Sequence, residues 1–150
     1  MLAFFKWMEG LAVYRSSIYL GPGINLVHLV SMSTFMGALL MVDLRLLGTG
    51  LTKQSVRQVA QSARPWLIAG LIGLVITGIP ALMATATQQY ASKVFWFKMY
   101  VLAAALIFTF TIRQRVVLKD EAGLGGKMVA LVSIVLWMSV AAGGRLIMYL

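Results

Sequence analysis

A few ionisable side chains interrupt the long apolar stretches of this sequence, and these are the residues that could do chemistry. They are His28, Asp43, Lys98 and Arg145. An ionisable group at membrane depth is costly, so each one needs either a partner or a function. His28 is the single histidine of the chain, and imidazole is a common ligand of metals and of haem iron. We expect it to be such a ligand or, alternatively, a buried histidine that forms a hydrogen bond to another helix.

Methionines next to His28 raise the question of copper. Asn25, His28, Met32 and Met36 follow one another at spacings of three or four residues, so they share one helical face. A thioether beside an imidazole can hold Cu(I), which makes His28 and Met32 the predicted metal ligands. Methionine is also an ordinary filler of apolar cores. Among the ten methionines only Met32 and Met36 form a close pair, which favours packing over a copper site.

Lys98 and Arg145 are predicted near the same membrane surface, Lys98 at the start of its helix and Arg145 near the end of its own. Side chains on a helix lean towards its N-terminus. Lys98 begins its apolar run and leans towards water, whereas Arg145 comes late in its run and leans into the membrane. Arg145 therefore needs a fixed partner, and we expect either Glu9 or the carboxylate of an acidic ligand, such as a haem propionate.

Asp43 is predicted near the opposite end, at the same depth as Arg64 and Arg113. An ion pair that fixes the register of the helices is favoured here over a proton relay. The sequence shows no Ser-His-Asp arrangement around His28, no paired carboxylate site and no glycine-rich phosphate loop. The sequence therefore contains no catalytic constellation, which favours a role other than catalysis and leaves the question of an enzyme open.

The elements that position these residues are membrane helices. The chain has 150 residues, of which 61% are hydrophobic and 11% charged, and its mean hydropathy is +0.90. Soluble domains are usually about half apolar and a quarter charged. A helix needs about 20 apolar residues to cross the hydrocarbon core. Four runs qualify: residues 24–47, 66–86, 94–112 and 128–150. The first of them is predicted to follow a Gly-Pro-Gly turn at residues 21–23.

Two further helices are predicted at the membrane surface. Residues 1–20 contain Lys6 and Glu9 and indicate a retained interfacial helix rather than a signal peptide. Residues 52–64 alternate basic and apolar faces, which predicts a short amphipathic helix on the cytoplasmic membrane surface. The expected fold is an all-α, antiparallel bundle of four transmembrane helices in a single domain.

Basic residues predict the orientation of this bundle. They gather around the first and third connections, whereas the middle connection has only Lys93. The positive-inside rule places the basic connections in the cytoplasm and both termini on the periplasmic side of a bacterial inner membrane. The net charge of +9 then reflects topology and contact with the lipid bilayer, and no nucleic acid is expected as a partner. The absence of cysteine excludes disulfides, iron–sulfur clusters and covalently attached haem.

A set of short motifs extends over nearly the whole chain. In order they are Trp7-Met8-Glu9, Arg15-Ser16-Ser17, His28-Leu29, Asp43-Leu44-Arg45-Leu46-Leu47-Gly48, Arg64-Pro65-Trp66, Thr77-Gly78, Phe97-Lys98-Met99, Leu136-Trp137 and Gly144-Arg145. This pattern resembles an uncharacterised family of small bacterial four-helix inner-membrane proteins. It is distantly similar to the membrane part of copper-resistance D proteins. The resemblance implies the fold and the location but no activity.

These observations lead to one predicted site and three hypotheses for function. Glu9, His28, Lys98 and Arg145 are predicted to meet at the outer end as a cofactor-binding site. The first hypothesis is a membrane subunit that carries a b-type haem or a metal, and the second is copper handling by an oligomer. The third, of which the first is a specific form, is an accessory or anchor subunit that packs against other membrane subunits or against itself.

Overall fold

The structure is a computed structural model that describes residues 2–11, 19–51, 53–119 and 123–146, with only the backbone of residues 145 and 146. Its elements are α1 (Leu2–Gly10), α2 (Leu20–Leu47), α3 (Val56–Ala84), α4 (Ala86–Ala91), α5 (Lys93–Phe108), the π-helical turn η2 (Thr109–Arg113), α6 (Gln114–Leu118) and α7 (Leu124–Leu146). The segments α5, η2 and α6 follow one another without a break. The described residues contain no strand, so the predicted all-α fold is confirmed.

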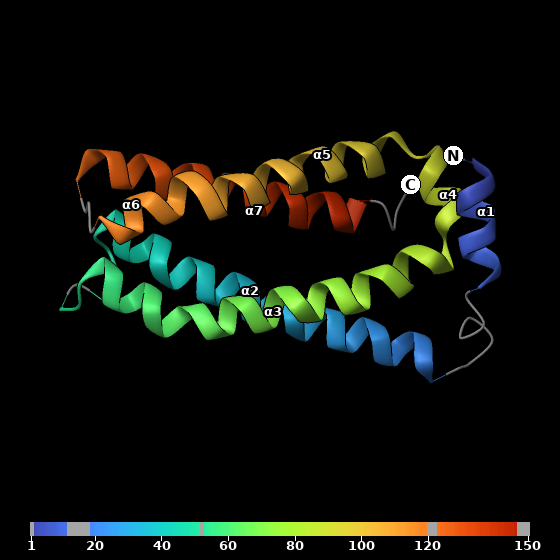
Figure 1. The fold of residues 1–150 in the computed structure, drawn as a ribbon, viewed down its shortest axis with the longest axis horizontal. Coiled ribbons are helices and arrows are strands. Elements are labelled where there is room, and N and C mark those ends of the chain that lie inside the picture. Colours follow the sequence, from blue (N-terminus) through green and yellow to red (C-terminus); the bar gives the residue numbers. More distant parts are fainter. Residues whose placement is uncertain (1, 12–18, 52, 120–122, 147–150) are drawn as a thin grey trace.

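Membrane-spanning helices dominate the fold. Four of the described segments are long and apolar enough to cross a membrane: Leu20–Leu47, Val56–Ala84, Lys93–Leu118 and Leu124–Gly144. They lie along one axis as two pairs, α2 with α3 and α5–α6 with α7 (Figure 1). This arrangement confirms the predicted bundle of four transmembrane helices.

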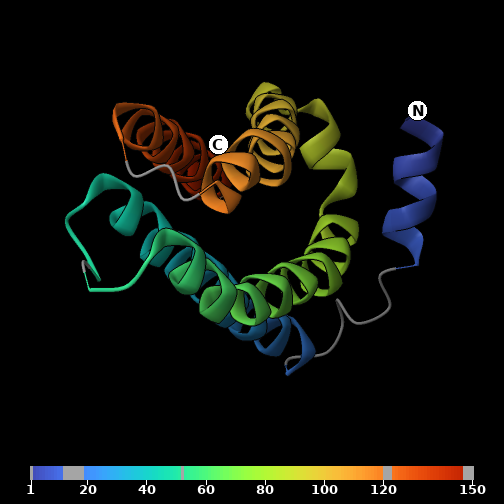
Figure 2. The same cartoon turned by 60° about the vertical axis from the view of Figure 1, so that its left-hand side comes forward.

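The two ends of the bundle differ. We call the end with the loops after α2 and after α6 the basic end, because Arg45, Lys53, Arg115 and Lys119 belong to these loops or to the adjoining helix turns. The opposite end carries α1 and α4, and we call it the terminal end (Figure 1). Figure 2 shows α1 outside the spanning helices, on the side of α4, where Phe5 contacts Tyr90 with ring centroids 5.0 Å apart. Such a position suits the interfacial helix predicted for residues 1–20, of which residues 12–18 lie outside the described part.

The protein core lies where the two pairs meet. Phe35, Leu39, Leu46 and Val56 are completely buried there, and Phe35 packs edge-on against Trp137 at a centroid distance of 4.5 Å. Large apolar side chains elsewhere on the same helices point outward, and Ile76 is 63% exposed. An outer surface of this kind is stable against lipid and not against water, which fits the membrane assignment.

The start of α2 corrects one boundary. The predicted turn at residues 21–23 does not form, because α2 already begins at Leu20. Pro22 is tolerated because the first four N–H groups of a helix have no intrahelical acceptor, so a missing N–H there costs no hydrogen bond.

A larger correction concerns the predicted surface helix at residues 52–64. The structure joins this segment to the next run, and α3 continues from Val56 through Pro65 to Ala84. A capping box starts this helix: the Gln58 N–H donates to the Ser55 hydroxyl, and the Ser55 N–H donates to the Gln58 side chain, both at 3.1 Å. The apolar face of the segment is buried in the protein core and does not lie on lipid, with Val56 0% exposed.

The later helices also extend beyond the predicted runs. The third span continues to Leu118 instead of ending at residue 112, and α7 begins at Leu124 instead of residue 128. Both extensions add polar residues at the basic end. The helix ends reach water there, so the end of an apolar run no longer coincides with the end of the helix. The predicted end of the last run at residues 147–150 lies outside the described part.

Two glycines allow α2 and α3 to approach closely. A Cβ built at Gly70 would lie 2.7 Å from the backbone nitrogen of Phe35, and one at Gly73 would lie 2.9 Å from the Cβ of Ser31. Small residues at a helix contact let two backbones come close. The contact face of α3 runs through Gly70, Gly73 and Thr77, whereas the neighbouring Ala69 is exposed.

Candidate functional site

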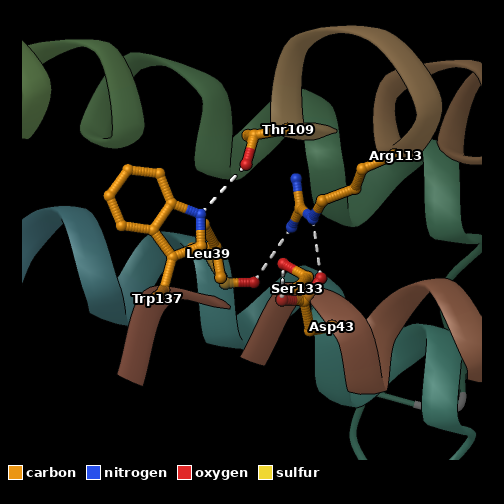
Figure 3. A network of polar contacts seen from close by, with 6 residues as sticks. All are labelled: Leu39, Asp43, Thr109, Arg113, Ser133 and Trp137. Atoms are coloured by element: carbon orange, nitrogen blue, oxygen red, sulfur yellow. Dashed lines mark hydrogen bonds and ion pairs between the residues drawn. The ribbon is translucent and has the colours of Figure 1, made fainter. Parts of the chain in front are cut away.

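An ion pair between Asp43 and Arg113 occupies the core towards the basic end (Figure 3). The Arg113 Nε donates to Asp43 Oδ1 at 2.7 Å, and its Nη2 donates to the carbonyl of Leu39 at 3.0 Å. The hydroxyl of Ser133 donates to Asp43 Oδ2 at 2.7 Å. Asp43 is 0% and Arg113 5% exposed. The predicted ion pair is therefore confirmed with Arg113, whereas Arg64 is exposed.

The π turn η2 contributes two side chains to this region. Thr109 and Arg113 are its first and last residues, and both are buried. The hydroxyl of Thr109 accepts a hydrogen bond from the indole N–H of Trp137 at 3.0 Å (Figure 3). The sequence offered only a weak signal for Thr109 and Ser133, which are single hydroxyls in apolar runs. Because Asp43 is bound by both Arg113 and Ser133 in the core, this network fixes the register of the helices.

His28 lies near the terminal end, in a chain of hydrogen bonds with α3. Its Nδ1 is 2.7 Å from the hydroxyl of Thr77, and that hydroxyl donates its one proton to the carbonyl of Gly73 at 2.6 Å. Thr77 can therefore only accept from the imidazole, so Nδ1 carries a proton. In the neutral ring the lone pair then lies on Nε2, which is the atom that a metal or haem iron would bind.

The surroundings of His28 keep Nε2 accessible. Among the described residues no group forms a hydrogen bond with Nε2, and no buried side-chain nitrogen or oxygen there lacks a partner, so Nε2 is not enclosed by protein. Gly78 lies beside the ring, and a Cβ there would be 3.7 Å from the imidazole Cε1. The structure thus shows the hydrogen bond across helices that was one of the two expectations for His28, and its role as a ligand stays a prediction.

Lys98 approaches the same end from α5. Its side chain lies over two glycines of α7, and a Cβ at Gly144 would be 3.4 Å from Nζ. No ion pair or hydrogen bond to Lys98 is found within the described residues. The cation is therefore available to an anionic group at the terminal end.

The other predicted site residues are less closely grouped. The carboxylate of Glu9 accepts hydrogen bonds from the backbone N–H and the hydroxyl of Thr87, and it thereby attaches α1 to α4. Met32 follows His28 by one turn of α2 and is half-buried. The backbone of Arg145 lies in the last turn of α7, directly after Gly144, but its side chain is outside the described part. The structure thus places His28 against α3 and Lys98 against α7 at the same end of the bundle, and it places Glu9 in a separate contact with α4.

Comparison with known proteins gives one match. A family of unknown function (DUF6644) matches residues 4–150. No curated protein matches the chain, and no solved structure matches it. The similarity to copper-resistance D proteins therefore stays a prediction. Because the family match covers almost the entire sequence, including every residue of the candidate site, the chain belongs to this family of unknown function.

Proposed function

We propose that the protein is a membrane subunit of a larger assembly and that it holds a b-type haem through Nε2 of His28. The observation that carries this proposal is the hydrogen-bond chain from His28 through Thr77 to the Gly73 carbonyl. Histidines that bind metals almost always donate their other N–H to a protein acceptor, which fixes the ring and the tautomer. Thr77 provides such an acceptor here.

Charge favours haem over a bare metal ion. Lys98 carries its charge at the same end of the bundle as His28, over Gly143 and Gly144 of α7, and the described residues contain no group of three or more His, Cys, Asp or Glu that could hold a metal. A copper ion bound by His28 and Met32 would thus meet an ammonium without a compensating carboxylate. Haem brings its own negative charge, because the porphyrin neutralises the iron and the two propionates are anionic. Lys98 is placed to pair with one propionate.

A second axial ligand for a haem at His28 would have to come from outside this helix, and this is one ground for proposing a subunit role. Met32 belongs to the same helix as His28 and lies one turn away, so it cannot reach the opposite face of a haem bound to His28. Around His28, α2 is open on several sides: Leu26, Val27 and Leu29 are each more than 50% exposed. A second chain, either another copy or a different subunit, would cover this part of α2 and supply the other ligand.

Haem titration of single variants tests this proposal. We expect the purified chain in detergent to bind hemin saturably, with a shift of the Soret band from its position for hemin in micelles, and we expect His28→Ala to abolish that shift. Thr77→Val removes the acceptor for Nδ1–H and should weaken binding about 10–100-fold, whereas Thr77→Ser should bind normally. Thr34→Val is the matched control, because the Thr34 hydroxyl makes the same kind of bond to a helix carbonyl, at 2.9 Å, away from His28.

Two results of this titration would contradict the proposal. The first is that the unmodified chain causes no saturable shift of the Soret band of hemin. The second is that His28→Ala binds hemin as tightly as the unmodified chain, which would show that the haem lies elsewhere or in the detergent micelle.

We further propose that the basic end faces the cytoplasm of a bacterial inner membrane and the terminal end the periplasm. The distribution of Lys and Arg supports this orientation. Because the chain has no cysteine, single cysteines can report it. We expect a membrane-impermeant maleimide to label Gln88→Cys in intact spheroplasts and to label Lys127→Cys only after lysis; the opposite pattern would reverse the proposed orientation.

A further inference from the structure

A groove between α3 and the η2–α6 segment opens near the basic end, away from His28. It has a cavity volume of about 400 Å³. Its α3 wall carries Arg57, Gln61, Arg64 and Ile68, which follow one another at spacings of three or four residues and so form one stripe of the helix. The groove is separate from the proposed haem site and from its ligands.

The polarity of this groove changes with depth. On α3, the basic and amide side chains come first from the basic end, and Ile68 lies about one turn deeper than Arg64. On the facing wall, Gln114 is nearer the basic end and Phe110 is one turn deeper. Ile68 is 41% and Phe110 44% exposed. The α3 wall of the groove is therefore cationic towards the basic end and apolar deeper in, whereas the facing wall is apolar at Leu118 and Val117 as well as at Phe110.

Positive charge also reaches the floor of the groove. Arg113 lines it, and its Nε and Nη2 are bound to Asp43 and Leu39. The remaining nitrogen, Nη1, has no partner among the described residues. Since no buried side-chain nitrogen or oxygen there lacks a partner, Nη1 is open to the groove. Figure 3 shows it on the side of Thr109, another lining residue, and away from the carboxylate.

We propose that this groove binds one anionic phospholipid, with its phosphate headgroup against Arg64, Arg57 and Arg113 and an acyl chain along Ile68 and Phe110. Charge complementarity carries the choice of ligand, because three guanidinium groups line the groove and none of its lining residues in the described part of the chain is acidic. Basic pockets between membrane helices bind lipid headgroups in this way. The apolar deeper part distinguishes a lipid from a small free anion, which would gain nothing from Ile68 and Phe110.

Native mass spectrometry of the chain with equimolar dioleoyl phosphatidylglycerol and dioleoyl phosphatidylcholine tests the proposal. We expect preferential binding of phosphatidylglycerol. Arg64→Gln should weaken it about fivefold, and the double variant Arg57→Gln/Arg64→Gln about thirtyfold, since each basic residue contributes about one fivefold step. Arg64→Lys keeps the charge and should retain binding. Arg115→Gln, an exposed arginine on α6 outside the groove, should leave the affinity unchanged.

Three outcomes would overturn the lipid site. The first is equal binding of the two lipids, and the second is an equal loss of affinity in Arg115→Gln and Arg64→Gln. The third is displacement of the lipid by glycerol phosphate at the lipid's own concentration, which would indicate a small-anion site. None of these results depends on haem, so failure of the lipid proposal leaves the proposal for His28 intact.

Discussion

Replacing Asp43 by alanine should destabilise the folded protein by about 3–5 kcal/mol, because the variant leaves the Arg113 guanidinium buried without its counter-ion. Arg113→Ala should cost a similar amount for the converse reason. The loss can be measured by reversible unfolding in mixed micelles. The hydroxyl of Ser133 donates one hydrogen bond to Asp43. Ser133→Ala removes only this bond to a charged group, so it should destabilise the protein less than Asp43→Ala does, by about 1.5–3 kcal/mol.

The double variant Asp43→Ala/Arg113→Met separates this explanation from a general effect of mutating the core. Removing both charges leaves no unpaired ion, so the double variant should be markedly more stable than Asp43→Ala alone. Arg115→Ala provides the surface control, and its exposed side chain predicts a change within about 0.5 kcal/mol. Additive losses in the double variant would show that the two side chains act independently.

The second large effect is expected at Gly70. In Gly70→Ala the new Cβ would lie 2.7 Å from the Phe35 backbone nitrogen and 2.9 Å from its Cα, and a backbone cannot give way as a side chain can. The helices α2 and α3 must then separate, and we expect a loss of about 1–3 kcal/mol in the same unfolding experiment.

Gly37→Ala is the matched control, because it makes the same change within a membrane helix where a Cβ meets nothing within 4 Å. Alanine is the better helix former by about 1 kcal/mol, so this variant should be as stable as the unmodified protein or more stable. If both glycine variants lost stability equally, the proposed close contact of α2 and α3 would be wrong.

The sequence predicts the helices well because a membrane span must be long and apolar. It predicts the ends of the helices poorly, because at the basic end tertiary contacts determine where each helix begins and ends. Residues 52–64 have a basic face and an apolar face, as a helix on the membrane surface would have. In the structure the apolar face is turned to the core, where Val56 is buried. The Ser55–Gln58 capping box starts a helix that continues through Pro65.

The candidate site could be predicted only in part. Unusual residue types marked His28, Asp43 and Lys98, because ionisable groups stand out in apolar runs. Their partners did not stand out, since Thr77 and Ser133 are ordinary membrane residues whose roles depend on which helices face each other. Likewise, whether Gly70 or Ala69 contacts α2 depends on how α3 is rotated about its axis, and the spacing of small residues does not determine that rotation.

The proposed role of His28 is tested most directly by pulsed electron paramagnetic resonance of the hemin-loaded chain labelled with ¹⁵N-histidine. Because His28 is the single histidine, any hyperfine coupling between the ferric iron and a ¹⁵N nucleus must come from it. Coordination by Nε2, the nitrogen left without a proton by the Nδ1–Thr77 hydrogen bond, predicts a coupled ¹⁵N that is lost in His28→Ala. A spectrum of the saturated, unmodified chain without ¹⁵N coupling would show that His28 does not bind the iron and would contradict the proposed function.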